Sequence, residues 1–346
     1  MTTRTDPAPG SARPNLAVRV WRKLLDSLPI SAPRAALYWG IASLVANVLI
    51  IFTGGVVRLT GSGLGCPTWP RCTPESLVPH PELGIHGAIE FGNRLMTFVL
   101  AFVAVGTALA AFRVRRDGLP RRDLRLLSLI MGFGIPLQAV IGGITVLTGL
   151  NPYVVAPHLM LSMALVGLST VYVRLAVHRP RNGTGRWGRR LAWLLFAVMW
   201  VVVWLGTIVT GSGPHSGDES SFRTGFDPYI VSRIHATSVQ VVVGLTLVAL
   251  LVLRNRAVVT LLAVEVAQGV IGYVQYFTGL PEPLVAAHLV GSALAVAAVT
   301  WVVVETYPSA SADPHEPATG TGAAPLLVPG RGPSDPPSVG DPSSAD

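Results

Sequence analysis

Four histidines fall inside or at the ends of long apolar stretches, where an ionisable side chain is costly and is a candidate for function. They are His86, His158, His235 and His288. A neutral imidazole is the commonest metal ligand in proteins, and two imidazoles from facing helices of a bundle can hold a haem iron from both sides. We interpret His235 and His288 as such a pair. The alternative for one intramembrane histidine is a structural hydrogen bond to a neighbouring helix.

The first half of the chain offers a less regular metal site. Aligning the second apolar stretch with the sixth places Asn93 opposite His235, and an amide is a poor ligand for haem iron. His86 lies seven residues before Asn93, which is two helical turns and about 10 Å along the axis. His86 is therefore either a metal ligand nearer the surface or a partner in an interfacial hydrogen bond. His158 is the other candidate ligand of this half.

Glu90 shares a helix face with His86 and Asn93, because residues 86, 90, 93 and 97 form one stripe. One interpretation is an ion pair with Arg94, four residues later. The other is a carboxylate aimed into a cofactor pocket, where it acts as an acid or base or stabilises positive charge. We favour the second, because a carboxylate on a packed face of a membrane helix needs a reason.

Three arginines lie near the ends of apolar stretches, at Arg58, Arg94 and Arg233. Each could pair with a carboxylate such as a haem propionate. The alternative is that their side chains extend to the membrane interface.

The elements that must position these residues are membrane helices. The chain has 346 residues, of which half are hydrophobic and only 13% are charged, about half of the charged fraction of a soluble domain. Continuous apolar runs exclude an ordinary soluble enzyme and disfavour a β-barrel, whose strands alternate. We predict an all-α polytopic membrane protein with eight transmembrane helices, at residues 36–57, 85–112, 124–148, 154–177, 191–211, 230–253, 257–279 and 285–305.

The basic residues predict the topology. The formal net charge is +8, and all 26 basic residues are arginine except Lys23. The arginines cluster after the second, fourth and sixth apolar stretches, which is typical of short cytoplasmic loops and argues against binding to nucleic acid. We therefore place both termini in the cytoplasm and the loops 58–84 and 212–229 outside.

The only two cysteines, Cys66 and Cys72, lie in the first outer loop, in the segment CPTWPRC. A five-residue spacer lets their Cα atoms approach within about 7 Å, and the outer compartment permits disulfides. Zinc binding would need further ligands at a suitable spacing. We predict a disulfide, either structural or redox-active.

The chain also repeats itself, since residues 138–159 match residues 268–289 without a gap. Equivalent positions are 130 residues apart and include Gln138 and Gln268, Gly142 and Gly272, and His158 and His288. Four spans separate the equivalents, which predicts two repeated four-helix bundles in parallel topology.

The predicted domain boundaries follow from these elements. The N-terminal four-helix half takes residues 35–178 and the C-terminal half residues 191–306, joined by a cytoplasmic linker at 179–190. Residues 1–34 and 307–346 are polar, proline-containing cytoplasmic tails, which we predict to be disordered.

Together these motifs resemble the haem A synthase family over about residues 36–305. The resemblance rests on GGVVRLTGSGLGCPTWPRC (54–72), on IEFGNR (89–94) and on the duplicated TGL…P…HL segments. It implies an enzyme of the bacterial cell membrane that oxidises the C8 methyl of haem O to a formyl group, giving haem A. It also implies haem O synthase and cytochrome c oxidase assembly as partners, with an electron acceptor that the sequence does not reveal.

The resemblance carries roles onto particular residues of this chain. The N-terminal half would be catalytic and hold haem O or haem A, with the essential glutamate at Glu90 and the fourth-span histidine at His158. The C-terminal half would hold haem b between His235 and His288. The family's outer-loop cysteine pair falls on the two cysteines of this chain.

One position departs from the family. Many members have histidine three residues after the glutamate, where this chain has Asn93. Either His158 is then the sole axial protein ligand of the substrate haem, or His86 substitutes with a different geometry.

Two other classes of function fit part of the pattern. A cytochrome b-like electron carrier would use the histidines equally well, but it would not explain Glu90, the cysteine loop or the asymmetry between halves. A transporter with repeated halves would use the histidines as a proton relay.

Overall fold

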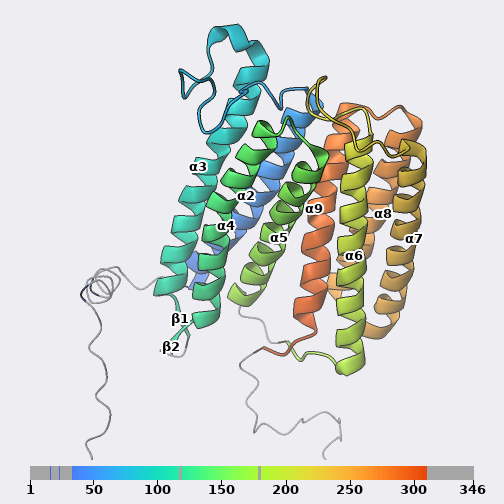
Figure 1. Cartoon of the computed structure of the whole chain (residues 1–346). Coiled ribbons are helices and arrows are strands. Elements are labelled where there is room, and N and C mark those ends of the chain that lie inside the picture. The colour runs from blue at the N-terminus through green and yellow to red at the C-terminus, as the bar shows by residue number, and fades with distance from the viewer. Residues whose placement is uncertain (1–15, 17–22, 24–32, 117–118, 178–180, 310–346) are drawn as a thin grey trace, which may run out of the picture. The chain divides into compact units, whose positions relative to one another are not determined.

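The computed structural model of the chain describes Leu16, Lys23 and residues 33–116, 119–177 and 181–309. Eight helices in these residues are long and apolar enough to cross a membrane (Figure 1). They are α2 (Pro33–Leu59), α3 (Gly84–Arg113), α4 (Arg122–Leu147), α5 (Pro152–Ala176), α6 (Arg186–Ser212), α7 (Pro228–Leu253), α8 (Arg256–Phe277) and α9 (Glu282–Glu305). The prediction of an all-α, multi-pass membrane protein is confirmed. The tails predicted to be disordered lie almost entirely outside the described residues.

Local sequence explains where several helices begin. Asn151 and Asp227 each precede a proline, whose fixed φ and missing N–H suit the first helical position. Their side chains accept hydrogen bonds from the backbone N–H of Tyr153 (2.9 Å) and Tyr229 (2.8 Å). These bonds cap α5 and α7 in the usual way for Asn and Asp.

The observed helix ends lie within three residues of the predicted ones except at α6, which begins at Arg186 instead of residue 191. The apolar pattern marks only the part of a helix that lies in hydrocarbon. The first turn of α6 is polar and aromatic, with Arg186 and Arg190 lying 5.5 Å and 4.9 Å from the ring centre of Trp187. A two-residue hairpin, β1 (Arg115–Arg116) and β2 (Leu119–Pro120), was not predicted.

The helices pack in two groups of four. α2, α3, α4 and α5 contact one another in chain order and α5 returns to α2, while α6, α7, α8 and α9 do the same. α5 and α9 lie side by side where the groups meet, and α2 also contacts α9 (Figure 1). That the groups are repeats of one another stays a prediction from the sequence.

The two TGL turns, before α5 and before α9, have the same backbone. Leu150 and Leu280 both have positive φ, 57° and 61°. The N–H of Leu150 donates to the carbonyl of Thr145 (2.8 Å), and that of Leu280 to the carbonyl of Gln275 (2.7 Å). These partners are also 130 residues apart, so the matching segments fold alike at these turns.

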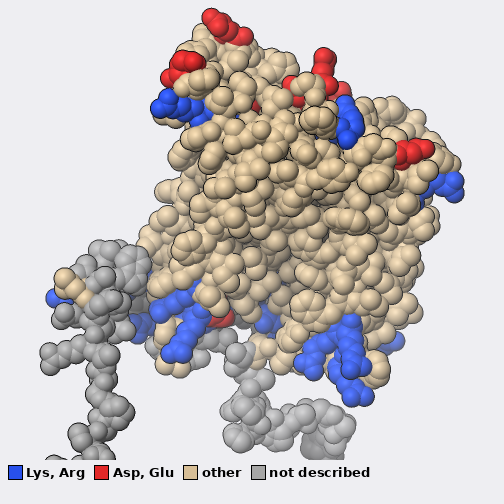
Figure 2. Space-filling view, viewed as in Figure 1, with Lys and Arg blue, Asp and Glu red and all other residues tan. Residues whose placement is uncertain are grey.

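Charge is distributed unevenly between the two ends of the helices. Arginines gather at the end that carries the α3–α4, α5–α6 and α7–α8 connections, which we call the arginine end (Figure 2). Acidic side chains lie mainly at the opposite end, with the long loops 60–83 and 213–227 (Figure 2). We call this the loop end.

The two long loops touch each other at the loop end. The N–H of Gly63 donates to the carbonyl of Gly217 (2.8 Å). Leu150 fills the space beside them, since a Cβ at Gly63 would lie 2.6 Å from its Cδ1 atom and a Cβ at Gly217 would lie 3.1 Å from it. Both positions therefore need glycine for the loops to approach.

Candidate functional site

His235 on α7 and His288 on α9 face each other across the second group of helices. Their ring centres are 6.4 Å apart and the ring planes are nearly perpendicular, at 84°. Two metal–nitrogen bonds of about 2 Å, with the two ring radii added, place ligating imidazole centres roughly 6 Å apart. The pair therefore fits a haem iron held from both sides.

Glycines on neighbouring helices leave room for these rings. A Cβ at Gly206 on α6 would lie 3.3 Å from Cε1 of His235, and one at Gly272 on α8 would lie 3.4 Å from Cε1 of His288. The Nδ1 atom of His288 is buried without a hydrogen-bond partner in the described part of the chain. A structural hydrogen bond to a neighbouring helix, the alternative role for this histidine, is therefore not supported at Nδ1.

His158 has the same setting in the first group of helices. It lies on α5 against α4, where a Cβ at Gly142 would lie 3.2 Å from its Cε1 atom. Its Nδ1 is likewise buried and has no partner among the described residues. Gln138 Nε2 donates to the carbonyl of His158 (3.2 Å) and to Ser162 Oγ (2.5 Å), which fixes this turn of α5 against α4.

Glu90 on α3 is buried, with only 4% of its surface exposed. Its Oε1 accepts from Arg94 Nη2 (2.6 Å), so the ion pair suggested by the spacing exists. Its Oε2 accepts from the backbone N–H of Cys66 (2.5 Å), and Arg94 Nη2 also donates to the carbonyl of Cys66 (2.9 Å). The carboxylate is thus held from two sides, by the next turn of its own helix and by the loop that contains Cys66.

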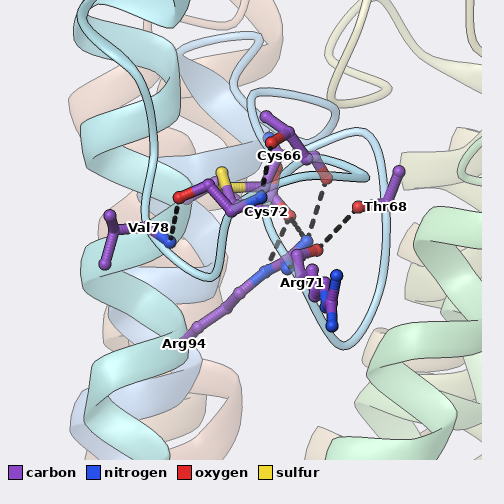
Figure 3. The surroundings of a disulfide bond; sticks show 9 residues. Cys66, Thr68, Arg71, Cys72, Val78 and Arg94 are labelled. Carbon is purple, nitrogen blue, oxygen red and sulfur yellow. Dashed lines mark hydrogen bonds and ion pairs between the residues drawn. A yellow bond between two sulfur atoms is a disulfide. The ribbon is translucent and has the colours of Figure 1, made fainter.

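The predicted disulfide between Cys66 and Cys72 is confirmed, with a Cα–Cα distance of 4.4 Å. Both cysteines are fully buried. Figure 3 shows Arg94 reaching from its helix to the loop that the disulfide closes, where it also donates to the carbonyl of Arg71 (3.2 Å). The disulfide loop and the Glu90–Arg94 pair therefore form one hydrogen-bonded unit.

The same loop also reaches α4. The ring of Trp69 lies against Gly143, where any Cβ would collide with it. Gly143 follows Gly142, the residue that packs on His158. The disulfide loop therefore joins the helix that carries Glu90 to the helix beside His158.

Replacing both cysteines by serine is expected to loosen this unit. Loss of a seven-residue ring costs about 2 kcal/mol of loop-closure free energy, and the N–H of residue 66 would no longer be fixed against Glu90. Because a displacement of about 1 Å at a reacting site can cost 10²-fold in rate, we expect a reaction that depends on the position of Glu90 to slow about tenfold to 10²-fold. Product yield per molecule of protein measures this.

Two controls make the disulfide prediction specific. Reduction of the disulfide in the unmodified protein, verified by alkylation of both freed thiols, should reproduce the loss. The His235–His288 pair should be unaffected, so the absorption spectrum of any haem bound between these two histidines should stay the same. Unchanged product formation in the double serine variant would show that the disulfide does not position Glu90.

His86 and Asn93 bind other partners. His86 is exposed near the start of α3, and its Nδ1 atom lies 2.9 Å from Ser62 Oγ. This hydrogen bond matches the second of the two roles considered for His86, a bond at the membrane interface. Asn93 Oδ1 accepts from Thr53 Oγ1 on α2 (2.7 Å). The side chain of Asn93 is thus used in packing α3 against α2.

The arginines that were candidates for propionate binding differ in their surroundings. Arg58 Nε donates to the carbonyl of His215 (2.5 Å) and its Nη2 to that of Thr210 (2.8 Å), which ties α2 to the end of α6. Arg94 donates hydrogen bonds to Glu90 and to carbonyl oxygens of the disulfide loop. Arg233 is exposed and stacks on the ring of Tyr229 at 5.5 Å, only two residues before His235.

One buried ionisable residue was not singled out from the sequence. Glu265 on α8 is 4% exposed, and its Oε1 accepts from Thr246 Oγ1 on α7 (2.9 Å). It lies seven residues before Gly272 on the same face of α8, roughly 10 Å further from the loop end. The signal that could have found it is an acidic residue in the middle of a membrane span.

Comparisons with known proteins identify the family of this chain. A model of the COX15-CtaA family, described as cytochrome oxidase assembly protein, matches residues 37–214, just over half of the chain. The "Heme A synthase" of Lysinibacillus sphaericus is 32% identical over 180 residues, which is 50% of this chain and 57% of the relative. That of Geobacillus thermodenitrificans is 30% identical over 147 residues, 41% and 44% respectively, and that of Listeria welshimeri is 29% identical over 126 residues, 36% and 40%.

These matches span about half the length of the curated relatives. The family match begins in α2 and ends just after α6. It includes the disulfide loop, Glu90 and His158, the residues that the structure joins at the loop end of the first four helices. The chain belongs to the COX15-CtaA family of cytochrome oxidase assembly proteins.

Proposed function

We propose that this protein is a haem A synthase, an oxidoreductase that converts the C8 methyl of haem O to a formyl group. Membership of the family and the name of the curated relatives support this activity. The observation that carries the proposal is the disulfide loop, which holds the buried Glu90 on one side and packs beside the Gly142–His158 contact on the other. A carboxylate and a haem ligand thereby share one covered end of the bundle.

The residues of the first half have separate roles in this proposal. His158 binds the iron of the substrate, haem O, and so fixes where the methyl group lies. Two successive two-electron oxidations, each adding one oxygen atom and passing its electrons to an acceptor, take the methyl to an alcohol and then to a gem-diol, which loses water to give the aldehyde. Glu90 accepts a proton or stabilises positive charge at the reacting carbon. Arg94 and the N–H of Cys66 keep its carboxylate in place.

The second half would hold haem b between His235 and His288. Held by both histidines, this group would supply electron transfer and would not activate oxygen. The small residues Gly206 and Gly272 leave space for the two imidazole rings that would hold it. Arg233 is the best placed of the three arginines to meet a propionate, because it is exposed and, among the described residues, donates only to the hydroxyl of Tyr229 (2.9 Å). Arg58 and Arg94 instead donate to carbonyls or a carboxylate.

Two further proposals concern the ligand of the substrate iron and the orientation of the helices in the membrane. We propose that His158 is the sole protein ligand of the substrate iron, since His86 is hydrogen-bonded to Ser62 at the surface. We also propose that the arginine end faces the cytoplasm of a bacterial cell, with both termini there. Haem O synthase would then deliver the substrate, and cytochrome c oxidase assembly would receive the product.

Extraction of haem pigments tests the proposed activity directly. Cells that make haem O but lack their own haem A synthase should accumulate formylated haem when they also make this protein. Haem O alone would persist in cells that carry the empty vector. Protein that binds haem b without forming any haem A would instead be a cytochrome b-like electron carrier, and protein without a Soret band would contradict both functions.

A further inference from the structure

A cavity of about 670 Å³ lies on the outside of the second group of helices, between α2, α8 and α9. Its walls are mainly apolar and include Phe52, Val56, Ile271, Val290 and Leu294. Phe52 and Leu294 are 40% and 46% exposed on helices that cross the membrane, so the cavity opens toward lipid. Its volume is that of a small-molecule site.

Two polar side chains of this cavity, Thr60 and Glu282, lie at the loop end, and Glu282 is largely exposed at the start of α9. The third, Gln268, lies nine residues before the end of α8, about 14 Å further into the span. A ligand that meets Gln268 must therefore carry a polar group between the apolar walls.

Gln268 does not behave like its equivalent in the first half. Gln138 donates to the carbonyl of His158 and to Ser162. The Oε1 atoms of both glutamines are buried without a partner among the described residues, but Gln268 Nε2 also makes no hydrogen bond to them. Its amide instead lies over Gly291, where any Cβ would collide with it. The first half has Leu161 at the equivalent position, so glycine here is what lets the amide line the cavity.

We propose that this cavity binds a lipid quinone, with Gln268 hydrogen-bonded to a ring oxygen and the isoprenoid tail against the apolar walls. An amide can donate to a quinone carbonyl or accept from a quinol hydroxyl. A lipid acyl chain would leave the buried amide unpaired, which is unfavourable. A flat ring with carbonyl oxygens and an apolar tail suits a single amide set among apolar walls.

The position of the cavity gives the quinone a redox role, and this part rests on the proposed function. Ala287 and Gly291 line the cavity, and His288 lies between them on the same helix. A bound quinol therefore lies one helix wall from the ligand pair. In becoming the quinone it loses two electrons and two protons. One quinol would thus supply one electron to the haem b of each of two protein molecules and release its two protons at the surface near Glu282. In the reverse direction, the quinone would take up two electrons and two protons and so serve as the electron acceptor that oxidation of haem O requires.

The experiment uses purified protein with its haem and a quinol with a ten-carbon tail, decylubiquinol, without oxygen. Stopped-flow absorbance should show haem reduction at a rate that saturates with quinol concentration. Gln268→Leu should raise the concentration needed for half the maximal rate about tenfold, the effect of losing roughly one hydrogen bond to the ligand. Gly291→Leu, which copies Leu161, should do the same or more by displacing the amide.

A matched control is Gly244→Leu, because Gly244 is exposed on α7 and a Cβ there meets nothing within 4 Å. This variant should be reduced by quinol like the unmodified protein. Dithionite should reduce all variants fully, which shows that the haem site is intact. Equal quinol dependence in all variants, or haem that dithionite reduces and quinol does not, would overturn the proposal.

A second measurement tests quinone binding independently of whether the protein binds haem. A photoreactive azidoquinone should label peptides of α8 and α9, and Gly291→Leu should abolish the label. A photoreactive fatty acid tests the alternative occupant and should not compete. If the protein had no haem at all, the proposed function would fail while labelling would still decide whether quinone binds. Labelling that is unchanged by Gly291→Leu would overturn quinone binding.

Discussion

Replacing Glu90 by glutamine is expected to lower haem A formation by about 10²-fold or more, the usual contribution of a positioned acid or base. Glutamine keeps nearly the same shape and can still accept from the N–H of Cys66. It cannot take up a proton or carry the negative charge that Arg94 now meets at 2.6 Å. The measurement is the ratio of haem A to haem O extracted from cells that supply haem O.

The second half provides the internal control for this variant. Haem b should remain bound between His235 and His288, because Glu90 lies in the other group of helices. Glu75→Gln changes an exposed carboxylate of the same outer loop and should leave haem A formation unchanged. Normal turnover by the Glu90→Gln protein would remove this residue from the mechanism and leave its ion pair with Arg94 as a purely structural feature.

Replacing His288 by alanine is expected to remove haem b from the purified protein. A six-coordinate haem needs both imidazoles, and the ring centres of this pair are only 6.4 Å apart. Alanine at His235 should have the same effect, and the double variant should lose no more than either single one, because the two ligands act as a unit. The haem b content per protein molecule and the low-spin absorption spectrum measure this.

An exposed histidine tests whether this loss is specific. His80 lies in loop 60–83, outside α7 and α9. The His80→Ala protein should keep the full haem b content. A His288→Ala protein that still showed a six-coordinate haem spectrum would mean that another residue is the ligand. It would also contradict the assignment of haem b to the second group of helices.

The helices could be predicted from the sequence because burial in lipid has a simple signature. Continuous apolar runs place the ends of α7 within two residues. The start of α6 was missed because Arg186 and Arg190 continue the helix outside the hydrocarbon region, where hydropathy carries no information. Backbone hydrogen bonds inside a helix do not stop where the apolar side chains stop.

The candidate site could be predicted only in part. The Glu90–Arg94 pair follows from a spacing of four residues on one helix, and the disulfide follows from the count of cysteines. The bond from the N–H of Cys66 to Glu90 joins residues 24 positions apart through an irregular loop. No periodic pattern encodes such a contact, and the same is true of Trp69 against Gly143.

The contact between loops 60–83 and 213–227 restricts how the length of either loop can change in evolution. Surface loops usually accept insertions and deletions freely. Here Gly63 and Gly217 meet at hydrogen-bonding distance, with Leu150 seated against both. An added or deleted residue in either loop would shift its glycine out of register with the other. A change of length in one loop therefore requires a compensating change in the other, and we expect the two loops to co-evolve.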